Sequence, residues 1–348
     1  MHQIVPNELL EKSSKILFIG GVAIGDFSYL HNYFEALHAQ YPNLKIDLWH
    51  DEYRGKNCLL RWKSQKHDIV YEWLESCAFF NKIYKNVGAW WNIPRFFKQL
   101  KREDYPIVVC LFNLRVARTE RFAKLISPQG FIVRAVDTSD FDCTINAFAY
   151  LFKKIFGINL SHEQRALSLK IPEKWINFTR SRIEEFGIKK DHKIIFLNSF
   201  AKDAKRCWGI DQVIELIKLL KQDKHFFNAS FIVNTLPDKK NSILNSVKNN
   251  CLHNVHVFTA QKSFFELPAV ISLSDLVISV DTSVVHLTYA LDKPLVALMR
   301  QKNAYIFPKT PKTCAIFTHN RSDWTKKIGV DVVFNSILNN IHRIGYVE

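Results

Sequence analysis

Short apolar runs alternate with helical patterns along most of this chain, and that alternation constrains its fold more than any other feature. Runs such as 107–112 and 276–280 are apolar at nearly every position rather than at every second position. Strands of this kind are typical of parallel sheets that helices cover on both faces. The strand candidates are 15–20, 45–49, 107–112, 131–136, 193–197, 229–233, 255–258, 276–280 and 294–298. The pattern predicts an α/β chain.

Helical spacing separates these apolar runs. Leu30, Tyr33, Phe34 and Leu37 have the spacing i, i+3, i+4 and i+7, which places them on one face of a helix. The other predicted helices cover 210–220, 239–249 and 263–272, and the last segment, 323–348, also has a helical pattern.

The alternation restarts near residue 190, after a polar and charged stretch over 161–191. We therefore expect two Rossmann-like, doubly wound domains that face each other across a cleft, residues 1–170 and 171–348. Domains of this type bind ligands at the carboxyl ends of their strands. The terminal helix could pack back on the N-terminal domain instead of its own.

Composition narrows the class of protein. The chain has 348 residues, 47% of them hydrophobic, and lysine plus arginine exceed aspartate plus glutamate by 15. This surplus favours anionic partners such as phosphorylated molecules, nucleic acid or an acidic membrane face. No apolar run has the roughly 18 residues of a membrane-spanning helix, and the N-terminal segment lacks the apolar core of a secretory signal. Seven scattered cysteines without a CxxC pair suit free thiols, so a cytoplasmic protein is expected.

The segment Gly20-Gly-Val-Ala-Ile-Gly-Asp26 follows the first strand candidate and leads into the first helix. Small residues there allow a sharp turn, and the start of a helix favours anions. The pattern is not G-x-G-x-x-G, because its first two glycines are adjacent, and this disfavours a nicotinamide dinucleotide site. Asp26 has two open interpretations: it caps the helix, or it acts as a catalytic base.

A second polar segment runs from Ser279 to Pro294. Its strand candidate ends at Val280, and a helix is predicted after Asp281-Thr-Ser283. The free N–H groups of that first turn, together with the Thr282 and Ser283 hydroxyls, would suit an anion. His286 stands three residues after Ser283, on the same helical face, either as a ligand contact or as a hydrogen-bonded core residue.

The loop Asn198-Ser-Phe-Ala-Lys-Asp-Ala-Lys-Arg-Cys-Trp208 follows the first strand candidate of the second half. Lys202, Lys205 and Arg206 are either solvated surface cations or ligands of a diphosphate, whose charges one helix terminus cannot neutralise. Three polar segments at strand ends suggest a nucleotide-diphosphate compound held mainly by the second domain, with a carboxylate of the first domain facing it.

These segments resemble glycosyltransferase family 9, the lipopolysaccharide heptosyltransferases. Residues 281–298 resemble the family signature D-T-x-x-x-H-L-x-A-A-L-x-x-P-x-V-x-L. Their sequence is Asp-Thr-Ser-Val-Val-His-Leu-Thr-Tyr-Ala-Leu-Asp-Lys-Pro-Leu-Val-Ala-Leu. Lys205-Arg-Cys-Trp208 resembles its K-x-W element, and Gly25-Asp26 resembles its N-terminal G-D. Ser283 stands where the family has glycine, and either Lys205 or Arg206 takes the place of the family lysine.

The resemblance implies a GT-B fold and an inverting, metal-independent transfer of heptose, or a related sugar, from an ADP-sugar donor. By the same resemblance Asp26 is the expected general base and Asp281 a ligand of the sugar hydroxyls, with Asp238 a weak candidate for the ribose. The expected acceptor is a phosphorylated glycolipid of the lipopolysaccharide core at the inner membrane face, where the protein would be peripheral. The donor-binding candidates are Ser199, Lys205, Arg206, Asp281, Thr282, Ser283 and His286; the acceptor-side candidates are Gly25 and Arg115.

Other functions leave weaker signals. Asp140-Phe-Asp142 is a D-x-D triplet, a pattern that can bind a metal ion but that often occurs by chance. The histidines do not have the spacing of zinc ligands. We therefore expect neither a metal nor a cofactor. The cations follow no nucleic-acid-binding motif. The stretch 90–102 mixes aromatic and basic residues; it is either a helix facing the core or a surface for an anionic membrane. A nucleotide-sugar-binding protein without catalysis and an NAD-dependent dehydrogenase remain the alternatives.

Overall fold

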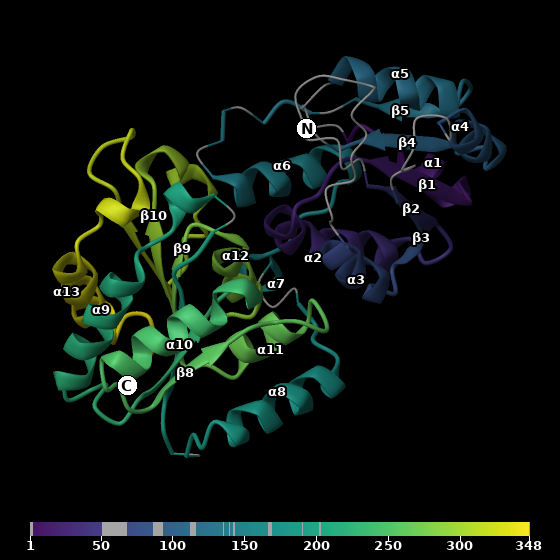
Figure 1. Ribbon diagram of the computed structural model, residues 1–348. Coiled ribbons are helices and arrows are strands. Elements are labelled where there is room, and N and C mark those ends of the chain that lie inside the picture. Colours follow the sequence, from purple (N-terminus) through teal and green to yellow (C-terminus); the bar gives the residue numbers. More distant parts are fainter. Residues whose placement is uncertain are drawn as a thin grey trace. The chain divides into compact units, whose positions relative to one another are not determined.

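The chain divides into two compact units, Met1–Arg165 and Ala166–Glu348, and each is described by itself. Each unit contains one parallel sheet with helices on both faces, which confirms the predicted α/β class (Figure 1). The computed structural model describes residues 3–50, 68–85, 93–111, 116–134, 136–138, 140–141, 143–165, 169–189, 191–201 and 203–347.

The sheet of unit 1 has five parallel strands in the order β3-β2-β1-β4-β5. The order reverses between β1 and β4, so the carboxyl ends of these two strands flank the crevice where such sheets bind ligands. The strands are β1 (Lys15–Ile19), β2 (Lys45–Trp49), β3 (Phe80–Tyr84), β4 (Ile107–Cys110) and β5 (Phe131–Val133).

Helices cover both faces of this sheet, and aromatic side chains fill much of the space between. Phe18 of β1 packs on Phe34 at 4.9 Å between ring centroids and on Phe156 at 5.8 Å, from the helices α2 and α6. Its neighbours Leu17 and Ile19 point to the opposite face, where α4 and α5 pack. The helices are α1 (Asn7–Lys12), α2 (Ile24–Gln40), α3 (Asp68–Ser76), α4 (Ile93–Arg102), α5 (Val116–Ile126), α6 (Thr144–Phe156) and α7 (His162–Arg165).

The sheet of unit 2 has six parallel strands in the order β11-β10-β9-β6-β7-β8. Renumbered within the unit, this is the Rossmann order 3-2-1-4-5-6 read from the opposite edge, and it reverses between β6 and β9. The strands are β6 (Ile194–Asn198), β7 (Ser230–Asn234), β8 (Val255–Phe258), β9 (Leu276–Val280), β10 (Leu295–Met299) and β11 (Thr313–Phe317).

Aliphatic side chains dominate the core of unit 2. One sheet face packs on α9, α10 and α13, whose Val333 and Ile337 are fully buried in it. The terminal helix thus packs on α9 and β11 of its own unit (Figure 1). The helices are α8 (Glu173–Glu185), α9 (Ile210–Gln222), α10 (Lys240–Asn249), α11 (Glu266–Ser272), α12 (Ser283–Ala290) and α13 (Val330–Asn340); the 3-10 turns are η2 (Ala204–Arg206), η3 (Pro237–Lys239), η4 (Gln301–Ile306) and η5 (Thr325–Lys327).

Two strands were missed by the sequence analysis. β3, with the sequence FNKIY, lies at one sheet edge and carries polar residues at two of its five positions, so it lacks the continuous apolar run of a central strand. β11, with the sequence TCAIF, is the edge strand of the other sheet. The predicted helix over 263–272 begins only at Glu266, because the Glu266 carboxylate accepts hydrogen bonds from the N–H groups of residues 261–263 and holds them in a turn.

Candidate functional site

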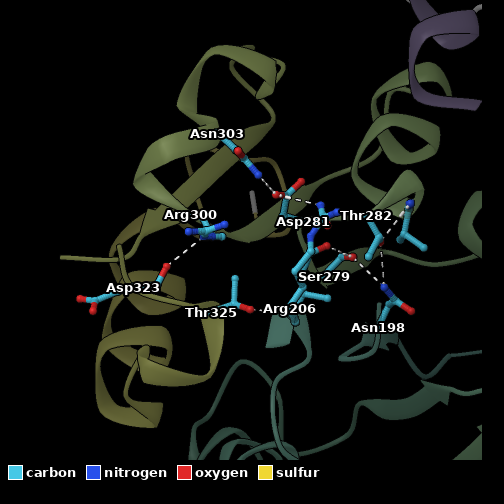
Figure 2. Close-up of polar contacts among 11 residues, drawn as sticks. Asn198, Arg206, Ser279, Asp281, Thr282, Arg300, Asn303, Asp323 and Thr325 are labelled. Carbon is cyan, nitrogen blue, oxygen red and sulfur yellow. Dashed lines mark hydrogen bonds and ion pairs between the residues drawn. The ribbon is translucent and has the colours of Figure 1, made fainter. Parts of the chain in front are cut away.

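A polar network lies at the point of unit 2 where the strand order reverses. Asn198, the last residue of β6, donates from Nδ2 to Ser279 Oγ at 3.0 Å and to Thr282 Oγ1 at 3.1 Å (Figure 2). Its Oδ1 accepts a hydrogen bond from Asn234 Nδ2, at the end of β7, at 2.9 Å. Asn198, Asn234 and Ser279 are all buried. The network therefore fixes the carboxyl ends of β6, β7 and β9 relative to one another.

The helix α12 begins where the network ends. Thr282 is its N-cap, and Thr282 Oγ1 accepts a hydrogen bond from the Val284 N–H at 3.3 Å. Ser283 is the first helical residue, and both it and His286 are partly exposed. The strand end at Val280 and the helix start were predicted correctly. Backbone N–H groups of this first turn, a hydroxyl and an imidazole thus gather at one helix terminus, which attracts anions.

A buried carboxylate lies beside that terminus. Asp281 is 1% exposed, and its Oδ2 accepts a hydrogen bond from Asn303 Nδ2 at 2.6 Å and pairs with Arg206 Nη2 at 2.9 Å. Arg206 also donates to the Asp281 carbonyl, and the Arg206 carbonyl accepts from Thr325 Oγ1 at 2.6 Å (Figure 2). Arg206 therefore connects η2, η5 and the end of β9.

Two further cations contact the ring of Trp324. The guanidinium of Arg300, just after β10, lies 3.9 Å from the centroid of the Trp324 ring, and Lys205 Nζ lies 5.6 Å from the same centroid. Arg300 Nε also donates to the Asp323 carbonyl at 3.0 Å (Figure 2). Lys205 is exposed, so its ammonium can contact a ligand directly. Arg206, in contrast, is already paired with the Asp281 carboxylate.

The crevice between β6 and β9 is almost filled. A pocket of about 10 Å³, enough for roughly one water molecule, lies there. Ser199 and Trp208 close it on one side; the Ser199 carbonyl accepts from the Trp208 N–H at 2.7 Å, and Trp208 Nε1 donates to the Ile328 carbonyl at 3.0 Å. A molecule larger than water would therefore have to lie over this edge rather than inside it.

In unit 1, Asp26 occupies the third position of α2 rather than the N-cap, which is Ala23. Its Oδ2 accepts a hydrogen bond from the Ala23 N–H at 3.2 Å, and its side chain is partly exposed. Val22, the residue before the N-cap Ala23, donates its N–H to Nδ1 of the buried His50 at 3.2 Å. Because a backbone N–H can only donate, this Nδ1 carries no proton, and His50 fixes the turn on which Asp26 sits.

The structure brings most of the predicted donor residues to one edge of unit 2: Ser199, Lys205, Arg206, Asp281, Thr282, Ser283 and His286 all follow β6 or β9. Gly25 adjoins Asp26 in the first turn of α2. Arg115, Lys202 and Asp142 lie outside the described residues, and Asp238 is exposed in η3. Sequence reasoning missed Asn234 and Asn303; only the polar ending of an otherwise apolar run, Ser-Phe-Ile-Val-Asn234, could have pointed to the first.

A comparison with protein families identifies the family that this chain resembles. The model of glycosyltransferase family 9 (heptosyltransferase) matches residues 93–323, which include Arg206 and Asp281 but not Asp26. No curated protein sequence matches the chain.

Solved structures with the same fold cover nearly the whole chain. A family 9 glycosyltransferase from Veillonella parvula has a TM-score of 0.73 at 14% identity, over 96% of this chain and 98% of its own. The E. coli ADP-heptose heptosyltransferase II has a TM-score of 0.65 at 16% identity, over 94% and 99%. The E. coli heptosyltransferase WaaC with ADP has a TM-score of 0.63 at 14% identity, over 96% and 100%. The fold is thus that of GT-B heptosyltransferases.

Proposed function

The chain belongs to glycosyltransferase family 9, and from this premise we propose that it transfers heptose or a related sugar from an ADP-sugar to a lipopolysaccharide core acceptor, with inversion. The observation that carries the proposal is the Arg206–Asp281–Asn303 cluster beside the N-terminus of α12, at the strand crossover of unit 2. A nucleotide diphosphate needs both positive charge and N–H donors, and this edge has both.

The donor would lie over the carboxyl edge of unit 2. In this proposal the first-turn N–H groups of α12 and the ammonium of Lys205 hold the diphosphate, with Ser199, Thr282, Ser283 and His286 beside them. Asp281 has one oxygen engaged by Arg206 and Asn303, so its second oxygen would accept a sugar hydroxyl. Two similar structures support an ADP-sugar donor, since the E. coli heptosyltransferase WaaC holds ADP in one and ADP-2-deoxy-2-fluoro heptose in the other.

Transfer with inversion is a single in-line displacement. Asp26 would take the proton of the acceptor hydroxyl as that oxygen attacks the anomeric carbon and the bond from this carbon to the diphosphate oxygen breaks. Negative charge then grows on the departing diphosphate, where the α12 N–H groups and Lys205 would stabilise it, with the Arg206–Asp281 pair beside them. These groups can supply the positive charge without a metal ion, and we expect transfer to be metal-independent.

The acceptor would be a phosphorylated glycolipid at the cytoplasmic face of the inner membrane, on the side of Gly25 and Arg115. The net charge of +15 supports an anionic acceptor. Among the described residues, no helix is long and apolar enough to cross a bilayer. In this proposal the protein associates with the membrane peripherally.

The test is ADP release from ADP-heptose in the presence of a deacylated core oligosaccharide, for wild type and Asp26→Asn. Loss of the base is expected to lower kcat at least about 100-fold while the dissociation constant of ADP stays within twofold. Glu35→Gln, on the same helix, is the matched control and should retain turnover. Turnover by Asp26→Asn equal to wild type would exclude Asp26 as the base, and no ADP release by wild type would contradict the proposed function.

A further inference from the structure

The helix α4 has two different faces. Phe96 and Leu100 are buried against the sheet of unit 1, with the Phe96 ring 5.1 Å from that of Trp49. This agrees with the core-facing interpretation of the 90–102 stretch for the part that the structure describes. The outward side is basic: the exposed cations of α4 are Arg95, Lys98, Lys101 and Arg102. The sequence of α4, IPRFFKQLKR, contains no acidic residue.

The helix α5 continues this basic side. It lies next to α4 on the same face of the sheet, and Phe97 and Phe122 join the two helices with ring centroids 5.0 Å apart (Figure 1). Arg121 and Lys124 are exposed on α5, and Leu125 is 60% exposed. Because both helices cover one sheet face, their outward sides point in one direction. We define the α4–α5 surface as Arg95, Lys98, Lys101, Arg102, Arg121, Lys124 and Leu125.

The charge of this surface is not compensated locally. Within the described residues, none of its six cations forms an ion pair, and Glu120 of α5 instead faces Arg134 at 3.6 Å. The helices α8 and α9, in contrast, carry both signs: α8 has Glu184 and Glu185 among its cations, and α9 has Asp211 and Glu215. The α4–α5 surface therefore has a positive potential that favours an extended anionic partner.

We propose that the α4–α5 surface binds the surface of an anionic lipid bilayer. Charge complementarity supports lipid phosphates as the partner, since lysine and arginine close to an anionic leaflet each strengthen binding about fivefold. The exposed Leu125 and the half-buried Phe97 and Phe122 add apolar groups among the cations, as in helices that lie within the headgroup region. The occupant is therefore a membrane rather than a single soluble phosphate.

This inference rests on the proposed function for its purpose, because an enzyme held at the bilayer would meet a glycolipid acceptor there. Its test does not depend on transfer. Vesicle binding measures the surface alone, and turnover with a lipid-free core oligosaccharide measures the active site alone. Loss of one measurement without the other shows which of the two proposals fails.

The experiment is co-sedimentation of the full chain with vesicles of phosphatidylglycerol and phosphatidylcholine, or of phosphatidylcholine only. We expect wild type to bind the anionic vesicles at least tenfold more tightly than the neutral ones, and less tightly as salt rises. The double variant Lys98→Glu/Arg102→Glu should lose at least tenfold in this affinity and keep its turnover on the lipid-free acceptor. The matched control Lys224→Glu/Lys248→Glu makes the same charge change at exposed sites of unit 2 and should bind almost as wild type.

A second variant separates a bilayer from other polyanions. Leu125→Ser leaves every charge in place and is expected to weaken vesicle binding severalfold without changing binding to heparin. Equal vesicle binding by wild type and Lys98→Glu/Arg102→Glu would overturn the proposal, as would an equal loss in the unit 2 control. Binding to RNA that exceeds binding to anionic vesicles, with no effect of Leu125→Ser, would identify a nucleic-acid surface instead.

Discussion

Each unit buries an aspartate at its sheet, and the two aspartates have different partners. Asp47 on β2 and Asp281 after β9 are both 1% exposed. Asp47 accepts hydrogen bonds from the Tyr105 hydroxyl at 2.5 Å and from Asn81 Nδ2 at 2.7 Å, both neutral donors. Asp281 accepts from the neutral Asn303 and also pairs with the cation Arg206.

The position of each carboxylate along its strand explains the difference. Asp47 is the third of five residues in β2, under helices, and burial together with the bond to Asp47 raises the pKa of Tyr105, so this hydroxyl stays a donor. Asp281 lies beyond the end of β9, at the strand crossover where ligands bind. Burial alone therefore does not distinguish the two carboxylates. The position of Asp281 at the crossover and its cationic partner are the reasons for which we propose it, and not Asp47, as a donor ligand.

The sharpest test of this comparison changes both aspartates to asparagine. Asp281→Asn removes the charge that orients Arg206 and is expected to weaken ADP-heptose binding at least about tenfold. Asp47→Asn replaces charge-assisted hydrogen bonds by neutral ones and should lower the free energy of unfolding by about 1–2 kcal/mol, with donor affinity unchanged. Calorimetric titration and urea unfolding measure the two effects. An equal loss of donor affinity in Asp281→Asn and Asp47→Asn would contradict the assignment of a donor-binding role to Asp281 alone.

A smaller effect is expected in the turn before α2. His50→Ala leaves the Val22 N–H without its acceptor and shifts the turn that holds Asp26, so kcat should fall about tenfold with ADP affinity unchanged. His50→Asn can still accept this N–H and should recover part of the lost turnover. Steady-state kinetics with the lipid-free acceptor, together with ADP titration, separate the two quantities. A loss of ADP affinity in His50→Ala would show that the role of the turn extends beyond Asp26.

The smallest expected effect concerns the stability of unit 1 alone. Hydrogen bonds from Lys82 Nζ at 2.6 Å and Lys15 Nζ at 3.0 Å lower the pKa of Glu103 below its ordinary value of 4.5. Because this pKa is lower in the folded state, the stabilisation is complete above about pH 4.5 and is lost as the pH falls through the folded value. Glu103→Gln should therefore cost about 0.5 kcal/mol at pH 7 and progressively less as the pH falls below the ordinary pKa of the carboxyl group, as measured by thermal unfolding. A difference that stays constant with pH would contradict this assignment.

The sequence predicted the strand and the helix that flank the candidate site of unit 2 better than the contacts within that site. The boundary between β9 and α12 was predicted because a continuous apolar run ends directly before Asp-Thr-Ser, a typical helix start. The bond between Arg206 and Asp281 joins residues 75 positions apart. Local patterns left Arg206 as either a solvated cation or a diphosphate ligand, and the family resemblance implied a sugar-binding role for Asp281. Neither indicated that the two residues pair with each other. Asn303 lies in a 3-10 turn, which has no hydrophobic periodicity that a sequence pattern could detect. The strand β3 has polar residues because Asn81 donates a hydrogen bond to Asp47 and Lys82 donates one to Glu103.

The central claim is that the carboxyl edge of unit 2 binds an ADP-sugar, and calorimetric titration of the full chain without added metal tests it most directly. We expect ADP and ADP-heptose to bind, UDP and NAD to bind far more weakly, and Lys205→Ala to lower the ADP affinity about tenfold. Asp26→Asn should leave this affinity unchanged. Binding of NAD without ADP, or ADP affinity that is the same in wild type, Lys205→Ala and Asp281→Asn, would contradict the account.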